Sequence, residues 1–194
     1  GKVSVDGVTY ALPEPFMVIA TQNPFGSVGT QKLPESQMDR FMIRVTMGYP
    51  SVEDEVSIMK SKTGGLSNRV LSKNVINAQD FMAMRDIVDE VYVDDSIYEY
   101  VAKIVAKTRD SEDILQGISP RGSISIINMA KAEAFLRGHD YVLPSDIQFV
   151  LNDTMAHRII LNRSLKRGHI TEESVIDSIC RSVDVPKIGT RGIL

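Results

Sequence analysis

The sequence lacks several features that would place it in an obvious class. Its 194 residues include one cysteine, Cys180, and no tryptophan. A single thiol excludes an internal disulfide and a cysteine zinc cage, and this cysteine usage fits a reducing cytosol. No apolar run approaches the roughly 20 residues that span a bilayer, and no secretory signal peptide is visible. We therefore expect a cytoplasmic protein that does not insert into a membrane.

The sequence also lacks a strong excess of either charge. Lys and Arg total 22 and Asp and Glu total 25, so the formal net charge is −3. This balance does not predict binding to nucleic acid or to an anionic membrane. Residues His157-Arg158, Arg163 and Lys166-Arg167 form a local basic patch, which we interpret as the solvated end of a helix. The histidines have no metal-ligand spacing, so no metal site is expected in this chain.

What the sequence does contain begins with an α/β pattern. Residues 3–10 alternate around Asp6-Gly7, which predicts a β-hairpin because both turn positions need positive φ. The apolar runs at 17–20 and 42–47 predict strands that are buried on both faces, as in a parallel sheet. Two such strands cannot form a stable sheet alone, so we expect the missing strands to lie before residue 1. Within this chain, we expect the two strands either to pair with a neighbouring copy or to lean on the helical part.

Helical signals dominate the rest of the chain. Periodic apolar residues, capping residues and prolines predict helices at 35–41, 51–62, 78–91, 95–109, 119–138, 144–161 and 171–182. Gly64-Gly65 breaks this series. The sequence therefore predicts an α/β part over residues 1–65 and an all-α part over residues 66–194.

Three polar residues are candidates for contact with an anion. Asn23 follows a predicted buried strand, where an amide can touch a phosphate oxygen or orient a water, or can simply turn the chain. Arg40 offers a planar fork of donors that suits phosphate, or a surface ion pair with Glu35 or Asp39. Arg121 lies at a predicted helix N-terminus, where either a bound phosphate or plain exposure explains a cation.

Five motifs, taken together, suggest a family. In order and spacing, ATQNP, LPESQMDRF, SPRGSISIINMAKAEAFLRG, LPSDI and HRIIL resemble the MoxR family of AAA+ ATPases. The resemblance covers residues 3–186. It implies the C-terminal part of an AAA+ P-loop core over residues 1–65, with a hairpin before the sensor 1 strand. It also implies a helical lid domain and tail over residues 66–194.

The resemblance assigns roles to the three candidates. Asn23 matches the sensor 1 residue, which positions the attacking water. Arg40 matches the arginine finger, which acts on ATP held by the neighbouring subunit. Arg121 matches sensor 2, which reports the nucleotide state from the lid. An arginine supplied in trans can contribute roughly 10³–10⁵ to the rate of phosphoryl transfer.

The resemblance also implies cofactors and partners. For the parent protein these are ATP, Mg²⁺, a homo-oligomeric ring of six subunits and a partner with a von Willebrand factor A domain. The implied function is a chaperone-like motor that remodels or activates protein complexes. Two alternatives remain open, which are a non-catalytic protein-interaction module and, with little support from charge, a helical nucleic-acid binder.

The sequence departs from the family in two places. No G-x-x-x-x-G-K-[ST] loop is present to cradle phosphates, and the stretch from Gly26 to Lys32 has the wrong spacing. Ile87-Val88-Asp89-Glu90 imitates a Walker B acidic pair, but it lies at the end of a predicted helix. We therefore expect a chain that follows Walker B in its parent, with no ATP bound to it and no ATPase activity of its own.

Overall fold

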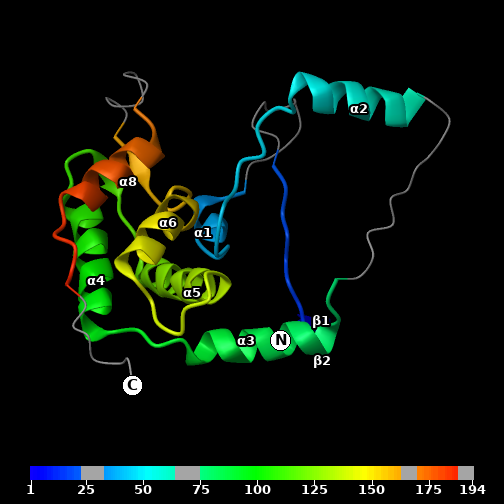
Figure 1. The fold of residues 1–194 in the computed structure, drawn as a ribbon, viewed down its shortest axis with the longest axis horizontal. Helices are drawn as coiled ribbons and strands as arrows, with labels where there is room; N and C mark the ends of the chain where they lie inside the picture. Colours follow the sequence, from blue (N-terminus) through cyan, green and yellow to red (C-terminus); the bar gives the residue numbers. More distant parts are fainter. Residues whose placement is uncertain (23–32, 64–74, 163–169, 188–194) are drawn as a thin grey trace.

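The computed structural model of the chain describes residues 1–22, 33–63, 75–162 and 170–187 (Figure 1). Its mainly helical architecture, with a small N-terminal hairpin, agrees with the predicted fold class. The elements in chain order are β1 (Lys2–Val5), β2 (Val8–Ala11), α1 (Glu35–Met38), α2 (Val52–Thr63), α3 (Ala78–Glu90), α4 (Asp95–Asp110), β3 (Ile114–Gln116), α5 (Pro120–Leu136), α6 (Pro144–Met155), β4 (Ile160–Leu161) and α8 (Glu172–Arg181).

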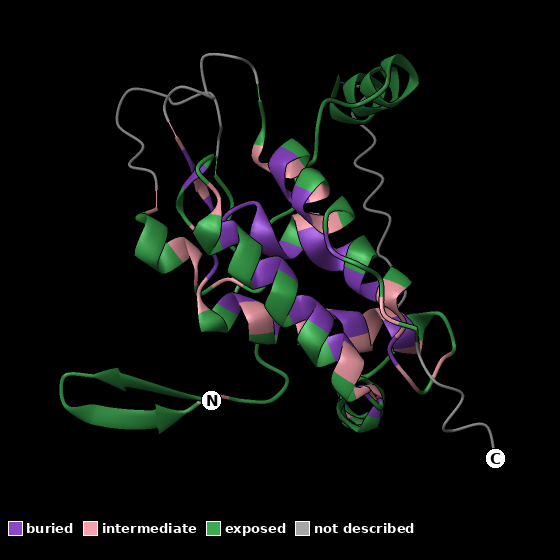
Figure 2. Ribbon diagram, turned by 90° about the vertical axis from the view of Figure 1, so that its left-hand side faces the viewer, coloured by how far each residue is buried: buried purple, intermediate pink, exposed green. Residues whose placement is uncertain are grey.

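The predicted hairpin is confirmed. Strands β1 and β2 pair antiparallel, with Val5 opposite Val8 at the turn. Asp6 and Gly7 both have positive φ, 50° and 79°, as a two-residue hairpin turn requires. Every residue of both strands is exposed, and the hairpin extends away from the helices (Figure 2).

The core lies among α4, α5, α6 and α8. Their inner faces are buried and their outer faces exposed, as the colours of Figure 2 show. Helix α5 presents Ile126, Ala130 and Ala134 at four-residue spacing, and all three are 0% exposed. The small alanine side chains let α6 pack closely against α5. The other helices contribute mainly branched aliphatic residues, including Ile97, Val101, Ile104, Ile147, Leu151, Val175 and Ile176.

Capping residues fix the ends of several helices close to their predicted positions. Asn77 and Asp80 form a reciprocal capping box at the start of α3, and Thr171 and Ser174 form another at the start of α8. Gly138, with φ of 80°, follows the end of α5.

Two helix ends were predicted wrongly. Helix α1 ends at Met38 and not at Phe41, because the chain turns at Asp39 and Arg40. Helix α6 ends at Met155 and not near residue 161, because Ile160–Leu161 form strand β4. This strand pairs antiparallel with β3, and Ile114 lies opposite Leu161. Both of these residues are buried, so pairing with a distant segment overrides the local helical pattern.

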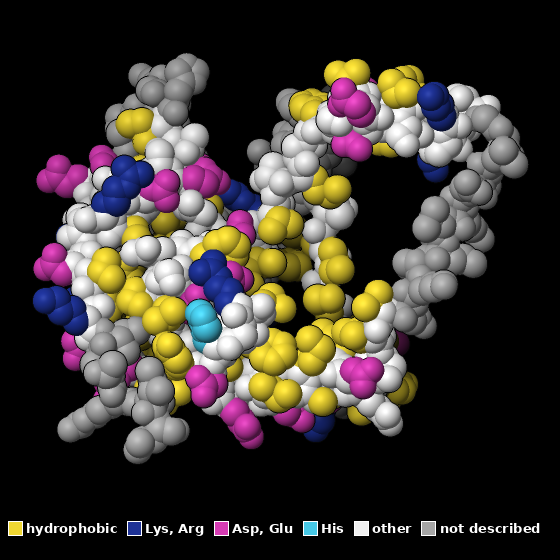
Figure 3. Space-filling model, in the orientation of Figure 1, with side chains coloured by type: hydrophobic (Ala, Val, Ile, Leu, Met, Phe, Trp, Pro, Cys, Tyr) yellow, Lys and Arg dark blue, Asp and Glu magenta, His cyan; other side chains and the backbone are white. Residues whose placement is uncertain are grey.

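The predicted buried strands are also wrong for this chain. Residues 16–20 and 42–47 have no regular secondary structure and are exposed, with Ile19 at 78% and Met47 at 95%. Strands need partners for their backbone groups, and no described residue forms a ladder with either segment. Apolar side chains therefore remain visible along the extended segments in Figure 3.

The second extended segment leans on the helices, which was one of the predicted alternatives. The backbone N–H of Arg44 donates to the carbonyl of Asp153 at 2.8 Å. The side chain of Arg44 pairs with Glu173 on α8 at 3.1 Å. The chain after α1 is thereby held beside α6 and α8. Separately, none of the described helices has the length and apolar character needed to cross a membrane.

Candidate functional site

Arg40 lies in the turn that follows α1. Pro34 precedes this short helix, and its carbonyl accepts from the N–H groups of Gln37 and Met38. Arg40 is exposed, and its side chain forms no ion pair or hydrogen bond with any described residue. The predicted ion pair with Glu35 or Asp39 is therefore not formed. Within the described part of the chain, the guanidinium therefore has no partner.

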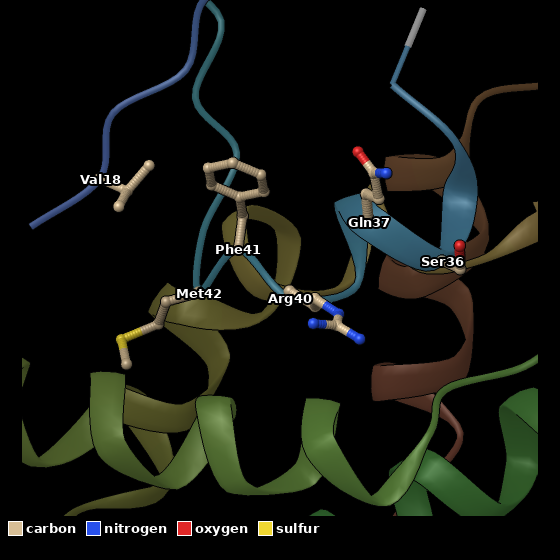
Figure 4. Close-up of a pocket in the computed structure, with 6 residues that line it drawn as sticks. All are labelled: Val18, Ser36, Gln37, Arg40, Phe41 and Met42. Atoms are coloured by element: carbon tan, nitrogen blue, oxygen red, sulfur yellow. The ribbon is translucent and has the colours of Figure 1, made fainter. Parts of the chain in front are cut away.

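A hollow of about 700 Å³ borders this turn. Figure 4 shows the lining residues, with the Phe41 ring and the Arg40 guanidinium pointing in different directions. The lining comes from the first extended segment, from α1 and from the turn after it, and consists of Val18, Ser36, Gln37, Arg40, Phe41 and Met42. The hollow thus combines apolar side chains with one cation.

Arg121 is the second residue of α5 and is exposed. It follows Pro120, whose fixed φ suits the first position of a helix. Ser119 occupies the N-cap position but makes no side-chain capping hydrogen bond. Its hydroxyl instead donates to the Asp39 carboxylate, at 3.1 and 3.2 Å from the two oxygens. The fold thereby brings the turn that carries Arg40 next to the start of the helix that carries Arg121.

The buried side chain of Arg158 forms hydrogen bonds with the turn that carries Arg40. Its side chain is 1% exposed, and its Nε donates to Asp39 Oδ1 at 3.1 Å. Its Nη2 donates to the carbonyls of Phe41 at 2.7 Å and Asp39 at 3.3 Å, and its Nη1 donates to that of Met42 at 3.3 Å. Two further acceptors, Thr154 O and Ser125 Oγ, belong to the helices.

Electrostatics explain why this arginine can be buried. Burial lowers the pKa of Arg158 below its ordinary value, and the charge and hydrogen bond of Asp39 oppose that shift. Exposed Arg121 also lowers the pKa of Arg158, because two like charges repel. A buried charge is tolerated only when it is paired and its donors are satisfied. Here all three guanidinium nitrogens have acceptors.

His157 contacts the same turn. Its Nε2 lies 3.1 Å from the carbonyl of Phe41, so this nitrogen is the donor and carries the proton. Its Nδ1 is buried without a hydrogen-bond partner among the described residues. Burial lowers the pKa of His157, which favours the neutral ring. The ring thus contacts the backbone of the turn that carries Arg40.

Gly122 makes room for Arg158. A Cβ added at this glycine would lie 2.4 Å from Ile118 Cγ2 and 3.2 Å from Arg158 Cδ. The first distance is impossible without movement, and the second is tighter than ordinary packing. The glycine in the motif SPRG therefore leaves room first for the Ile118 side chain and also for the stem of Arg158.

The interpretation of the basic patch as a solvated helix end is wrong for His157 and Arg158. Both residues are buried, at 6% and 4% exposed. The burial of Arg158 could have been inferred from the sequence. Arg158 follows Leu151 and Met155 at intervals of four and three residues, and both of those residues are buried on one helix face. A charge on an apolar stripe indicates a buried pair. The remaining residues of the patch, and Asn23, lie outside the described residues.

Comparisons with known proteins agree with this arrangement. Residues 106–179 match the family model of the AAA lid domain, and residues 1–43 match that of the ATPase family associated with various cellular activities. The uncharacterized protein YeaC of Bacillus subtilis is 41% identical over 96% of this chain and 58% of its own length. Chaperone MoxR1 of Mycobacterium tuberculosis is 34% identical over 96% of this chain and 51% of its own length.

A solved structure completes the comparison. A protein of Cytophaga hutchinsonii assigned to the ATPases matches with a TM-score of 0.84 and 34% identity, over 96% of this chain and 59% of that one. Taken together, the two family models and these relatives support a MoxR-type AAA+ ATPase chain. It spans between half and three fifths of the length of these relatives.

AAA+ ATPases use a nucleotide with Mg²⁺, and two described side chains have donors that suit its phosphates. Arg40 and Arg121 are exposed guanidinium groups on adjoining segments, and their planar donor forks suit phosphate oxygens. The described residues hold no group of three His, Cys, Asp or Glu side chains that could bind a metal ion. The chemistry of these two arginines, and of no described metal-ligand group, thus suits a phosphate.

Proposed function

We propose that this chain supplies the arginine finger and the lid of an ATP-driven, ring-forming MoxR motor that remodels or activates protein complexes. The observation that carries the proposal is Arg40, which is exposed at the end of α1 and bound to none of the described side chains. Arg40 lies beside Asp39, yet that carboxylate binds Arg158 and Ser119 instead.

The proposed roles follow the positions of the side chains. Arg40 projects from the turn and reaches ATP bound by the neighbouring subunit, as an arginine finger does in trans. Arg121 lies on the helical lid, which we place at residues 66–194 after the core part at 1–65. There it contacts the nucleotide of its own subunit. Asn23 would orient the attacking water as sensor 1. ATP with Mg²⁺ supplies the phosphoryl group that is transferred to water.

The partners are part of the same proposal. A trans-acting arginine requires a homo-oligomer, which we take to be a ring of six subunits. The name Chaperone MoxR1, carried by a 34% identical relative, supports protein clients for the motor. A protein with a von Willebrand factor A domain is the partner that we propose. The wholly exposed hairpin of β1 and β2 offers a surface for such contacts.

The test uses the longer protein, meaning this chain joined to the part of its relatives that it does not match. We expect Arg40→Ala to abolish hydrolysis, a loss of roughly 10³–10⁵ in turnover, while ATP binding stays nearly intact. Arg121→Ala should weaken nucleotide binding as well as turnover. The matched control is Arg44→Ala, because Arg44 lies four residues away in an exposed ion pair worth at most about 1 kcal/mol.

Mixed rings test whether the arginine acts in trans. Arg40→Ala subunits mixed with subunits that carry a Walker B substitution should recover part of the turnover, because some interfaces then combine an intact site with an intact arginine. Wild-type turnover of Arg40→Ala at saturating ATP would contradict the proposal. It would favour the alternative of a non-catalytic interaction module.

A further inference from the structure

The turn that carries Arg40 is hydrogen-bonded to the later helices at several points. Four of the acceptors of Arg158 lie in residues 39–42, namely Asp39 Oδ1 and the carbonyls of Asp39, Phe41 and Met42. These acceptors belong to the finger segment, which we define as residues 39–44. The remaining acceptors of Arg158, Thr154 O and Ser125 Oγ, belong to α6 and α5.

The burial of Arg158 makes this attachment difficult to open. A guanidinium that is 1% exposed would lose most of its hydrogen bonds if the finger segment moved away. An unpaired buried charge is strongly unfavourable, so the segment and the helices are expected to move together. Two further hydrogen bonds also hold the segment to the helices. His157 donates to Phe41 O, and the Arg44 N–H donates to Asp153 O.

The attachment also includes the start of α5. The Ser119 hydroxyl donates to Asp39, and Gly122 leaves room for the Arg158 stem. Arg121 lies between these two residues on the same turn of helix. The segments of Arg40 and Arg121 are therefore parts of one bonded unit.

We propose that Arg158 is a positioning residue for Arg40, fixing the finger segment to the helical lid so that Arg40 and Arg121 of one subunit move as a single body. This inference rests on the proposed function, in which Arg40 serves the neighbouring ATP and Arg121 the subunit's own. A lid movement that follows the subunit's own nucleotide then displaces the arginine at the next site. Arg158 thereby couples adjacent ATP sites without touching either nucleotide.

The test replaces Arg158 in the longer protein. Arg158→Met keeps an apolar stem and removes every donor, and Arg158→Lys keeps the charge without the fork. We expect Arg158→Met to lower kcat about 100-fold with KM for ATP unchanged, because a small displacement of a catalytic group has that effect. Arg158→Lys should recover part of the loss. Lys103→Gln, which removes an exposed ion pair with Glu99 within α4, is the control and should keep its turnover.

A double variant separates positioning from a general structural role. In an Arg40→Ala background, single-turnover assays should show no further loss on adding Arg158→Met, because Arg158 acts through Arg40. A further loss of similar size in that background would overturn the proposal. If Arg158→Met does not fold, Asp39→Asn gives the same comparison. Asp39 is 29% exposed, and the substitution removes its charge and replaces one acceptor oxygen with an amide donor.

Hydrogen exchange provides a readout that does not depend on ATPase activity. In Arg158→Met, the amides of residues 39–44 should exchange faster, including that of Arg44, while the core of α4 keeps its protection. Unchanged exchange would overturn the attachment itself. Faster exchange with wild-type turnover would overturn the positioning role. Wild-type turnover of Arg40→Ala, by contrast, would refute the proposed function, and the exchange result would still decide whether Arg158 holds the segment.

Discussion

At the residue scale, His157, which contacts the finger segment, makes the stability of the folded chain depend on pH. Its ring is buried, so its pKa lies below the ordinary value of about 6.5, with a contribution from nearby Arg158 and Arg44. The unfolded chain takes up a proton as the pH falls through about 6.5, whereas the folded chain does not. The unfolded state then binds more protons, and stability falls with acidification until the folded pKa is reached. Above about pH 7 this contribution is fully present.

We therefore predict a loss of stability between pH 7.5 and 5.5 that depends on His157. Urea unfolding of the 194-residue chain should show a smaller loss in His157→Gln than in the wild type. Glutamine can still donate to the Phe41 carbonyl but does not titrate, so it removes the proton linkage alone. Equal losses in the two proteins would show that His157 is not responsible.

The exposed arginines of the candidate site could be recognised from the sequence, but the hydrogen bonds that hold the turn beside them could not. Arg40 and Arg121 were recognisable from their motifs and are both exposed. The bonds of Asp39 were not predictable, because its partner Arg158 lies 119 positions away. Local sequence patterns do not show which two distant residues will form an ion pair. Only the position of Arg158 on the buried stripe of Leu151 and Met155 hints at it.

At the element scale, local signals predicted helices well and strands poorly. Caps and periodicity are properties of neighbouring residues, so α3, α4, α5 and α8 begin and end within about two residues of expectation. The segments at 16–20 and 42–47 have the apolar character of buried strands, but a strand depends on its partners. In this chain they are exposed, and the folding energy comes from the helical core.

We predict that substitution of a buried isoleucine will destabilise the 194-residue chain, whereas substitution of an exposed isoleucine will change its stability very little. Ile104→Ala, at a residue 0% exposed in the core, should lower the free energy of unfolding by about 2–5 kcal/mol. Ile19→Asp, at a residue 78% exposed, should change it by no more than about 0.5 kcal/mol. Chemical denaturation measures both.

The same Ile19 variant has a different expected effect in the longer protein. If residues 16–20 form a buried strand there, a buried aspartate without a partner should destabilise that protein strongly. The 194-residue chain is the matched control for the chemistry of the substitution. A large loss in the 194-residue chain would contradict the exposed placement of Ile19, and no loss in the longer protein would contradict the buried strand.

At the scale of the whole molecule, the described residues form a unit that contributes to two nucleotide sites in our proposal. Arg121 belongs to the subunit's own site and Arg40 to the neighbour's, and Arg158 joins the segments that carry them. A lid bonded in this way would transmit movement between subunits with few intervening contacts. The fold of the lid could be predicted from the sequence, but this connection could not, because it depends on how α1, α5 and α6 meet.

The last prediction concerns the 194-residue chain alone. Its sequence has no G-x-x-x-x-G-K-[ST] loop, and the backbone N–H groups and lysine of that loop are what hold the phosphates of ATP. Arginines without this cradle meet a strongly hydrated triphosphate in water, where their attraction is screened. We expect no phosphate release above a buffer blank and no ATP affinity tighter than about 1 mM by calorimetry. Arg40→Ala and Arg121→Ala should change neither result, whereas each should change turnover in the longer protein. Turnover that co-purifies with the 194-residue chain and disappears in Arg40→Ala would show that this chain carries a phosphate site of its own.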